Sequence, residues 1–468
     1  MTVYPKEPRG DATDSTRLLC AAAYIDEGFA GSLIDGTLRS TRQAVAPHFG
    51  VDIEPVLLHC LAAQRRRRAR DFALGVFLLL AIVAVWSGMT PLYGTVVRLL
   101  VLSWAVVLLL ECLDRFEMLP TFQPNRFDAA AAPPASPAEA LTVAEVSRLA
   151  HGDVTVYRGF VPFAGAGLQG ETWSFVTDIS RGIMGPDGPR TPRTFTVESL
   201  YAEITKQVRD LGIPSLEVED RIFLNGADAA AERWLFPGRS RRPETDAPDG
   251  KVEEVMRSGA QRVRHYLTMR IVDWRGEMVV SMHLRFVISG NHLYTEASYC
   301  LVPPLRESFR KVDGLSPAPD WRSAATVIGR SIVKTLPALA LAPFRVITAM
   351  FSGLTDSDDD DRDPLVDHGA NLSARELAMS TTKYLHYFQK VDHDMHTKLI
   401  EFRMLDALNV FLEDHGIDTE RTRQQQVNII NSGVLMTGGV INTETMAVGA
   451  RARAKKLVRT MAAAVDGK

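Results

Sequence analysis

The sequence predicts an α+β protein in which a transmembrane helical hairpin carries helical regions and a mainly antiparallel β-sheet domain in the cytoplasm. Two long apolar stretches within residues 71–114 predict the hairpin. Runs of β-branched and aromatic residues within 151–302 predict the sheet. Apolar side chains that recur every three or four residues predict helices within 1–70 and 373–424.

The hairpin consists of two apolar segments, residues 72–88 and 92–113, separated by a short turn. The first holds no charged residue over 17 positions, which gives about 25 Å of helix and just suffices to cross hydrocarbon. The second is longer and contains Arg98, about two turns from its start, where a long side chain can reach the nearer interface. We therefore expect two spans.

Arginines gathered immediately before the first span predict the topology. The turn from Ser87 to Tyr93 holds no lysine or arginine, so the arginine-rich side should remain cytoplasmic. Two spans return the chain to its starting side, which places both termini in the cytoplasm of a multi-pass protein of the cell membrane. We interpret this run as a topology signal that contacts anionic lipid, and a net charge of −3 gives no reason to expect a nucleic-acid partner. The run comprises Arg65, Arg66, Arg67, Arg68 and Arg70.

The segments on the two sides of the hairpin differ in sequence composition. Residues 1–70 read as a cytoplasmic helical region, in which Asp52 has the position of an N-cap for its final helix. Residues 115–150 are expected to form a linker, because 128–140 are rich in alanine and proline. Four scattered cysteines suggest neither a zinc site nor a disulfide framework.

The α+β domain is expected over residues 151–302. The Arg275-Gly276 pair predicts a hairpin turn, and a helix is expected at Val197–Leu211. Pro237–Gly250 is expected to be an exposed loop. The expected strands are Val154–Tyr157, Trp173–Ile179, Leu216–Leu224, Val263–Trp274, Glu277–Ile288 and His292–Leu301.

The remainder of the chain is predicted to be mainly helical. Within the amphipathic or linker region 303–372, charges and prolines interrupt the apolar stretch Ile328–Leu354, which favours amphipathic helices on the membrane or over the sheet rather than a third span. An acidic loop, Asp358–Asp361, follows. A helical region, 373–424, contains a stripe at helical spacing, made of Met395, Leu399, Phe402, Leu405, Leu408 and Phe411.

A glycine- and asparagine-rich β element with a basic tail is expected over residues 425–468. Its short apolar arms could pair with a second copy or a partner through residues 427–449, or fold back on the preceding helices. The candidate interaction residues are Val427, Ile429, Val434, Met436, Val440, Met446 and Val448.

Two patterns could carry chemistry, and both have a plainer interpretation. Gly165, Gly167 and Gly170 match a dinucleotide-binding string, but a strand follows where that motif needs a helix, which favours an ordinary glycine loop. His386, His393 and His396 could bind a metal, although their spacing is not that of a known motif and a solvated helical face is the simpler interpretation. We expect no cofactor and no bound metal, and no motif supports an enzyme.

Three blocks together resemble a group of uncharacterised actinobacterial membrane proteins. They are TRLLCAAAYID with GVDIEPVLLHCLAAQRRRRARDF, VYRGFVPFAGAGLQGETWSFVTDI, and INSGVLMTGGVINTETMAVGARA. The resemblance supports the architecture and implies no activity. We therefore expect a membrane-anchored interaction or scaffold protein; a ligand-sensing or transport-accessory protein and a membrane-tethered enzyme remain alternatives.

Overall fold

The computed structural model describes residues 14–88, 90–185, 188–213, 215–237, 241–259, 261–315, 320–351 and 366–427. The chain divides into two units, Met1–Thr422 and Arg423–Lys468. The second unit is described only from Arg423 to Val427, so the architecture below is that of the first.

A six-stranded sheet with the order β1-β5-β6-β7-β8-β2 organises the α+β domain. The strand β1 pairs parallel with β5, and every other neighbouring pair is antiparallel. The predicted mainly antiparallel sheet is therefore confirmed. The strands are β1 (Val154–Tyr157), β2 (Leu168–Asp178), β5 (Leu216–Asn225), β6 (Val263–Asp273), β7 (Met278–Ser289) and β8 (His292–Val302), and a small ribbon pairs β3 (Met184–Gly185) with β4 (Gly188–Pro189).

The two edges of this sheet differ. The β1 edge is covered by an extended segment, since Ala370 N–H donates to the Val156 carbonyl oxygen at 2.8 Å. The other edge strand, β2, runs for 11 residues and pairs with β8 only among the described parts of the chain. Most of its side chains are exposed or half-buried. Thr177 is buried and lies 3.1 Å from the Thr422 hydroxyl. Among the described residues, no strand pairs with the outer edge of β2.

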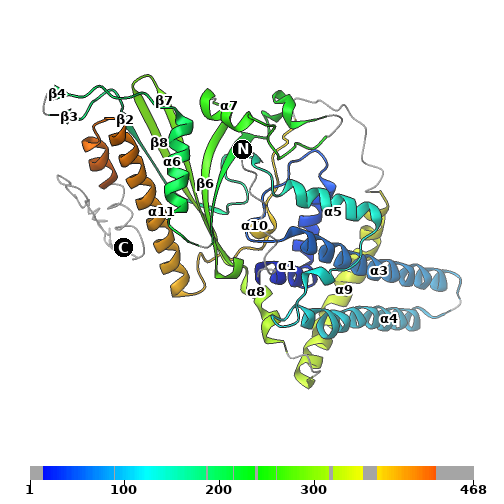
Figure 1. Cartoon of the computed structure of the whole chain (residues 1–468). Coiled ribbons are helices and arrows are strands. Elements are labelled where there is room, and N and C mark those ends of the chain that lie inside the picture. The colour runs from blue at the N-terminus through cyan, green and yellow to red at the C-terminus, as the bar shows by residue number, and fades with distance from the viewer. Residues whose placement is uncertain are drawn as a thin grey trace, which may run out of the picture. The chain divides into compact units, whose positions relative to one another are not determined.

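Helices cover one face of the sheet and irregular segments cover the other (Figure 1). On the first face, α6 (Val197–Arg209) packs Tyr201 against Phe286, and α11 (Tyr387–Asp414) places Glu401 2.6 Å from the Tyr299 hydroxyl. On the opposite face, Phe163 stacks on His283 with ring centroids 4.0 Å apart. A short helix, α7 (Lys251–Ser258), also packs against β6 and β5.

A helical core forms around the first half of α3 (Ile53–Trp86). Asp52 caps this helix by accepting a hydrogen bond from Glu54 N–H at 3.2 Å, as predicted. Its apolar face packs against α1 (Asp14–Ile25) and α2 (Glu27–Ile34), so burial of apolar area holds these helices together. The shorter elements that complete this core are η1 (Asp35–Arg39), η3 (Leu119–Phe122), α5 (Pro137–Leu149), α8 (Glu307–Arg310), η8 (Lys311–Gly314) and α10 (Ala374–Ala378).

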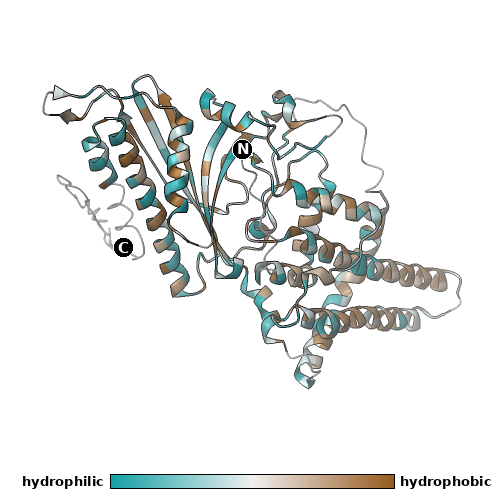
Figure 2. Cartoon of the chain, viewed as in Figure 1, coloured by the Kyte–Doolittle hydropathy of each residue, from teal (hydrophilic) through white to brown (hydrophobic). Residues whose placement is uncertain are grey.

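Three helices of the described structure are long and apolar enough to cross a membrane: Ile53–Trp86, Leu92–Phe122 and Trp321–Thr348. The first contains residues 72–86 of the predicted segment 72–88, and the second contains the predicted segment 92–113. Helix α4 (Leu92–Cys112) continues through η2 (Leu113–Met118) into η3. Large apolar side chains such as Leu79, Leu80 and Val101 are more than half exposed along them. Figure 2 shows the hydrophobic colouring along the projecting ends of α3 and α4.

The third of these helices, α9 (Trp321–Phe351), is continuous through Pro337 and Pro343. In Figure 1 it runs across α3 and α4 rather than along them. Its contacts agree, because the Lys334 ammonium lies 2.5 Å from Glu111 of α4 while the Arg345 guanidinium lies 3.5 Å from Asp71 of α3. A small core beneath it joins the three helices through Leu74, Val107, Ala338, Leu339 and Ala342.

Several segments differ from expectation. The expected linker 115–150 contains α5, which begins with a capping box between Ser136 and Glu139 and buries one face, whereas the alanine and proline content had suggested a chain without packing. The expected exposed loop 237–250 buries Arg242, which donates to the Thr37 and Ser40 carbonyl oxygens. The acidic loop 358–361 lies outside the described residues.

The predicted C-terminal helical stripe does not form one face. Met395, Leu399 and Phe402 of α11 are 41–65% exposed. Leu405, Leu408 and Phe411 are buried. Successive residues of a helix advance by about 100°, so Leu405, ten residues after Met395, points about 80° away from it around the helix axis.

Candidate functional site

A large cavity lies where α3 changes from polar to apolar sequence. It has a volume of about 510 Å³ and is an open cleft lined by α2, η1, α3 and the last turns of α9. We call it the arginine cleft, because four arginines line it. Its lining residues are Glu27, Ala30, Gly31, Arg39, Gln64, Arg67, Arg68, Asp71, Phe72, Arg345, Val346 and Thr348.

Helical periodicity places the α3 contribution on one side. Gln64, Arg67, Arg68 and Asp71 are three or four residues apart, so they share a helical face. Asp26 caps α2 through a 3.1 Å bond from Phe29 N–H, which fixes the start of the helix that carries Glu27 into the cleft. The cleft is therefore built from segments far apart in sequence.

The two carboxylates of the cleft are already neutralised within it. Asp71 is buried and accepts a 2.8 Å hydrogen bond from Arg70 Nε. Arg345 lies 3.1 Å from Glu27 and 3.5 Å from Asp71, so one guanidinium serves both acids. This leaves the remaining arginines of the cleft in excess over acidic groups.

Two of these remaining arginines are partly engaged and one is open. Arg39 pairs with Asp35 at 2.6 Å, and Arg67 donates to the Ala23 and Tyr24 carbonyl oxygens. Within the described ranges, the exposed Arg68 side chain forms no hydrogen bond or ion pair. A guanidinium with unused N–H donors at a cavity wall can bind an anion.

The structure separates the five arginines of the predicted topology signal. Arg65 faces away from the cleft and pairs with Glu139 of α5 at 2.5 Å, and Arg66 pairs with Asp114 at 3.2 Å. Only Arg67 and Arg68 line the cleft. The sequence analysis did not identify Arg345 as the partner of Glu27 and Asp71. Its position as a charged residue within an apolar stretch could have marked it as a candidate for an ion pair.

The predicted glycine loop has a structural role. Gly165 and Gly167 have φ near +80°, and their N–H groups both donate to Glu376 Oε1, at 3.0 and 3.3 Å. Glu376 also closes a capping box at the start of α10 with Ser373. The donors that would hold a phosphate are thus used by a carboxylate of the protein itself. This agrees with the expectation of an ordinary glycine loop.

The three candidate histidines do not converge. His396 lies 3.0 Å from Asp273, whereas His393 lies 3.0 Å from the Tyr384 hydroxyl, and His386 precedes the first turn of α11. Across the part of the chain that the structure describes, no group of three metal-ligating side chains is found. The arrangement provides no positive support for a metal site.

A family model described as the AbeC-like domain matches residues 172–443, which is more than half of the chain. The chain belongs to the AbeC-like domain family. No curated protein and no solved structure matches the chain. The match brings no activity with it.

The AbeC-like domain begins in β2 and contains α9 and α11 but neither helix of the hairpin. The arginine cleft therefore joins Arg345 of the AbeC-like domain to α2 and α3, which precede it. The predicted interaction element belongs partly to the same family match, but all its residues except Val427 lie outside the described residues.

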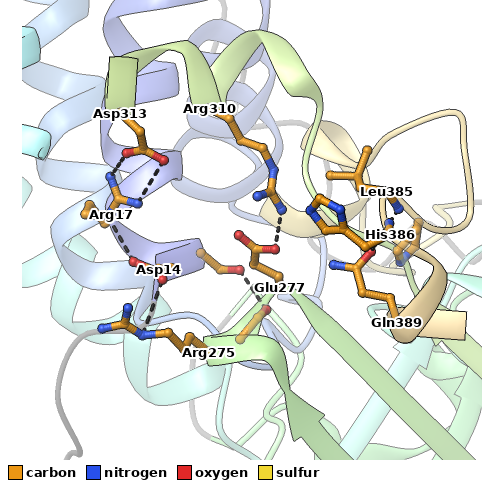
Figure 3. Close-up of polar contacts among 12 residues, drawn as sticks. Asp14, Arg17, Arg275, Glu277, Arg310, Asp313, Leu385, His386 and Gln389 are labelled. Carbon is orange, nitrogen blue, oxygen red and sulfur yellow. Dashed lines mark hydrogen bonds and ion pairs between the residues drawn. The ribbon is translucent and has the colours of Figure 1, made fainter. Parts of the chain in front are cut away.

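A polar joint connects the AbeC-like domain to α1 (Figure 3). Arg17 pairs with Asp14 at 3.1 Å and with Asp313 at 2.5 Å, and Glu277 at the start of β7 pairs with Arg310. Beside them, η7 (Trp274–Gly276) forms the turn between β6 and β7, and its Arg275 pairs with Asp14 at 3.4 Å. The predicted hairpin turn is confirmed.

This turn has a strained backbone. Trp274 and Arg275 have φ of 53° and 54°, which side-chain-bearing residues adopt at a cost, and Gly276 follows with φ of 86°. Ser15 of α1 donates to the Gly276 carbonyl oxygen at 2.6 Å, and Trp274 Nε1–H donates to Asp392 at 3.0 Å. Contacts from both α1 and α11 thus hold the turn in place.

Proposed function

We propose that the protein is a membrane-anchored interaction protein that holds its AbeC-like domain at the cytoplasmic face of the membrane. The hairpin of α3 and α4 would cross the bilayer, because its exposed side chains are apolar over the length that hydrocarbon requires. Arginines at the base of α3 and their absence from the connecting turn support cytoplasmic termini.

In this proposal, α9 lies in the membrane interface. Its length and composition would also allow a span. Its course across the base of the hairpin, where Lys334 and Arg345 pair with acids of α4 and α3, supports an interfacial position instead. Ile332, Val333, Leu336 and Phe344 are more than half exposed and would enter the headgroup region. Its charged residues Lys334 and Arg345 are held by acids of α3 and α4.

The observation that carries the interaction function is the outer edge of β2, which pairs with no strand other than β8 among the described residues. An exposed edge strand presents unpaired N–H and C=O groups, which another strand can satisfy. We assign its occupant as the apolar element 427–449 of a second copy of this chain. Forty-one residues follow Val427, which is enough to reach a neighbouring copy. Reciprocal exchange would give a closed twofold dimer.

Lysine substitution at the edge tests this proposal in the full-length protein. Val176 of β2 is 48% exposed, and Val176→Lys would place a charge against the added strand. Val161, which is 39% exposed outside the strands, provides the matched control Val161→Lys. Native mass measurement in detergent should give a dimer for the wild type and for Val161→Lys, and a monomer for Val176→Lys.

A third variant, Val434→Lys, should also give a monomer, because it charges the arm that is proposed to pair. A monomeric wild-type protein would mean that no second copy covers the edge. A dimer that survives both Val176→Lys and Val434→Lys would place the interface elsewhere and overturn the assignment.

A further inference from the structure

We propose that the arginine cleft binds the phosphate of an anionic phospholipid headgroup. This inference rests on the membrane placement in the proposed function, but not on the second copy at the β2 edge. The proposal names the ligand of the cleft. The topology signal, in contrast, concerns only the side of the membrane on which the arginines lie.

The position of the cleft fits a headgroup. Along α3, Arg68 is followed at one helical turn by Phe72, which is 63% exposed and is the first residue of the apolar span. Val346 of α9 lines the same cavity and packs near Gly75 of α3. A phosphate beside Arg68 would thus have apolar wall next to it, on the side where the acyl chains of a lipid extend.

The charge balance of the cleft also fits an anion. Four arginines face two carboxylates, and Arg345 holds both of those acids. Arg67 is fixed by the backbone carbonyls at the end of α1, so its guanidinium stays at the cleft wall. Arg68 would supply the free donors, and guanidinium groups match phosphate oxygens geometrically.

The volume of the cleft leaves room for the ligand. A Cβ built on Gly31 of α2 meets no atom within 4 Å, although Gly31 lines the cavity. A large side chain at this position would therefore start into the cleft without a clash at its Cβ. Gly31→Phe blocks the cleft without changing its charge, and replacement of a helical glycine does not weaken the helix.

Native mass spectrometry of the full-length protein tests the proposal, with phosphatidylglycerol as the anionic probe and phosphatidylcholine as the zwitterionic one. The wild type should retain phosphatidylglycerol preferentially. Arg68→Gln should weaken this retention by about tenfold, as expected for one charge-assisted contact. Gly31→Phe should weaken it as well.

Arg65→Gln is the matched control, because it removes the same charge from the same helix at a residue that pairs with Glu139 outside the cleft. It should retain phosphatidylglycerol like the wild type. Equal losses for Arg65→Gln and Arg68→Gln, or full retention by Gly31→Phe, would reduce the effect to general basic charge and overturn the proposal.

Two additional measurements distinguish the ways in which the lipid proposal could fail. Displacement of phosphatidylglycerol by millimolar inorganic phosphate would assign the cleft to a soluble phosphate and overturn the lipid source. If alkaline carbonate extracts the protein from membranes, the hairpin does not span the bilayer, and the proposed function on which this inference rests is wrong. The oligomeric state is read from the same spectra, so failure of the proposed dimer is recognised independently.

Discussion

Replacement of Gly167 by alanine tests the structural interpretation of the glycine loop. Gly167 has φ of +80°, and an added Cβ would lie 2.5 Å from the Leu301 carbonyl oxygen and 2.9 Å from Val302 Cα. Gly159 has nearly the same φ, +79°, but nothing lies within 4 Å of an added Cβ. Gly159→Ala is therefore a control for the backbone conformation alone.

The expected magnitudes follow from these two contributions. The left-handed conformation costs an alanine about 1–2 kcal/mol at either position. Only Gly167→Ala adds a clash with the β8 backbone, which should cost about 1–3 kcal/mol more in the free energy of unfolding. Because both substitutions remove the same freedom from the unfolded chain, that effect cancels in their difference.

Thermal unfolding of the full-length protein in detergent provides the assay. Gly167→Ala should lower Tm by several degrees more than Gly159→Ala, and ATP or NAD should bind neither variant nor the wild type. Equal Tm values for the two variants would refute the argument from close approach. Saturable ATP or NAD binding that Gly167→Ala abolishes without loss of fold would refute the structural interpretation itself.

Two further predictions concern buried groups. Burial lowers the pKa of His48 and His283 to about 3 in the folded protein. As the pH falls below about 6.5, these histidines become protonated in the unfolded chain but not in the folded one, which favours unfolding. The free energy of unfolding should therefore fall by about 1.4 kcal/mol per histidine between neutral pH and pH 5.5. Burial also lowers the pKa of His59 to about 4, so it adds to the same loss. Tm measured from pH 7.5 to 5.5 should fall, and His283→Gln should make this fall smaller without abolishing it; an unchanged slope would contradict the assignment. Arg375 is fully buried and donates to Ser15 Oγ and to the Glu277 carbonyl oxygen. Arg375→Met leaves these buried acceptors without their donor, so it should lower the free energy of unfolding by about 1–3 kcal/mol. Denaturant unfolding would check this, and a loss below about 1 kcal/mol would show that the hydrogen bonds contribute little.

The strands could be predicted because their sequences carry local signals. The predicted Val154–Tyr157 coincides with β1, and the predicted His292–Leu301 differs from β8 by one residue at its end. β-Branched and aromatic residues suit a pleated, half-buried surface wherever they occur. The order of the strands could not be predicted in the same way. Strand β2 pairs with β8 at the edge of the sheet, and no local sequence pattern specifies that partner.

The arginine cleft shows why sites are harder to predict than elements. Arg67 and Arg68 were identified as part of a basic run, but their separation from Arg65 depends on which helix packs on which face of α3. Arg345 reaches the cleft from nearly 280 positions away. One sequence without covarying positions gives no indication of such a contact.

The same reasoning explains the two rejected chemical patterns. The glycine string is followed by a strand in the structure, as the sequence predicted. The carboxylate that occupies its N–H groups, Glu376, lies more than 200 residues later and could not be foreseen. The histidines lie close in sequence, but His393 and His396 bond to different partners, Tyr384 and Asp273, which the sequence could not indicate.

Cysteine labelling from each side of the membrane tests the central claim most directly. Ser87 lies after the first span, whereas Trp321 and Thr348 mark the two ends of α9, and all three are exposed. With Cys112 replaced by alanine, a membrane-impermeant reagent should label Ser87→Cys from outside intact cells. It should label both Trp321→Cys and Thr348→Cys only in inverted vesicles. Labelling of the two ends of α9 from opposite sides would make α9 a third span and contradict the account.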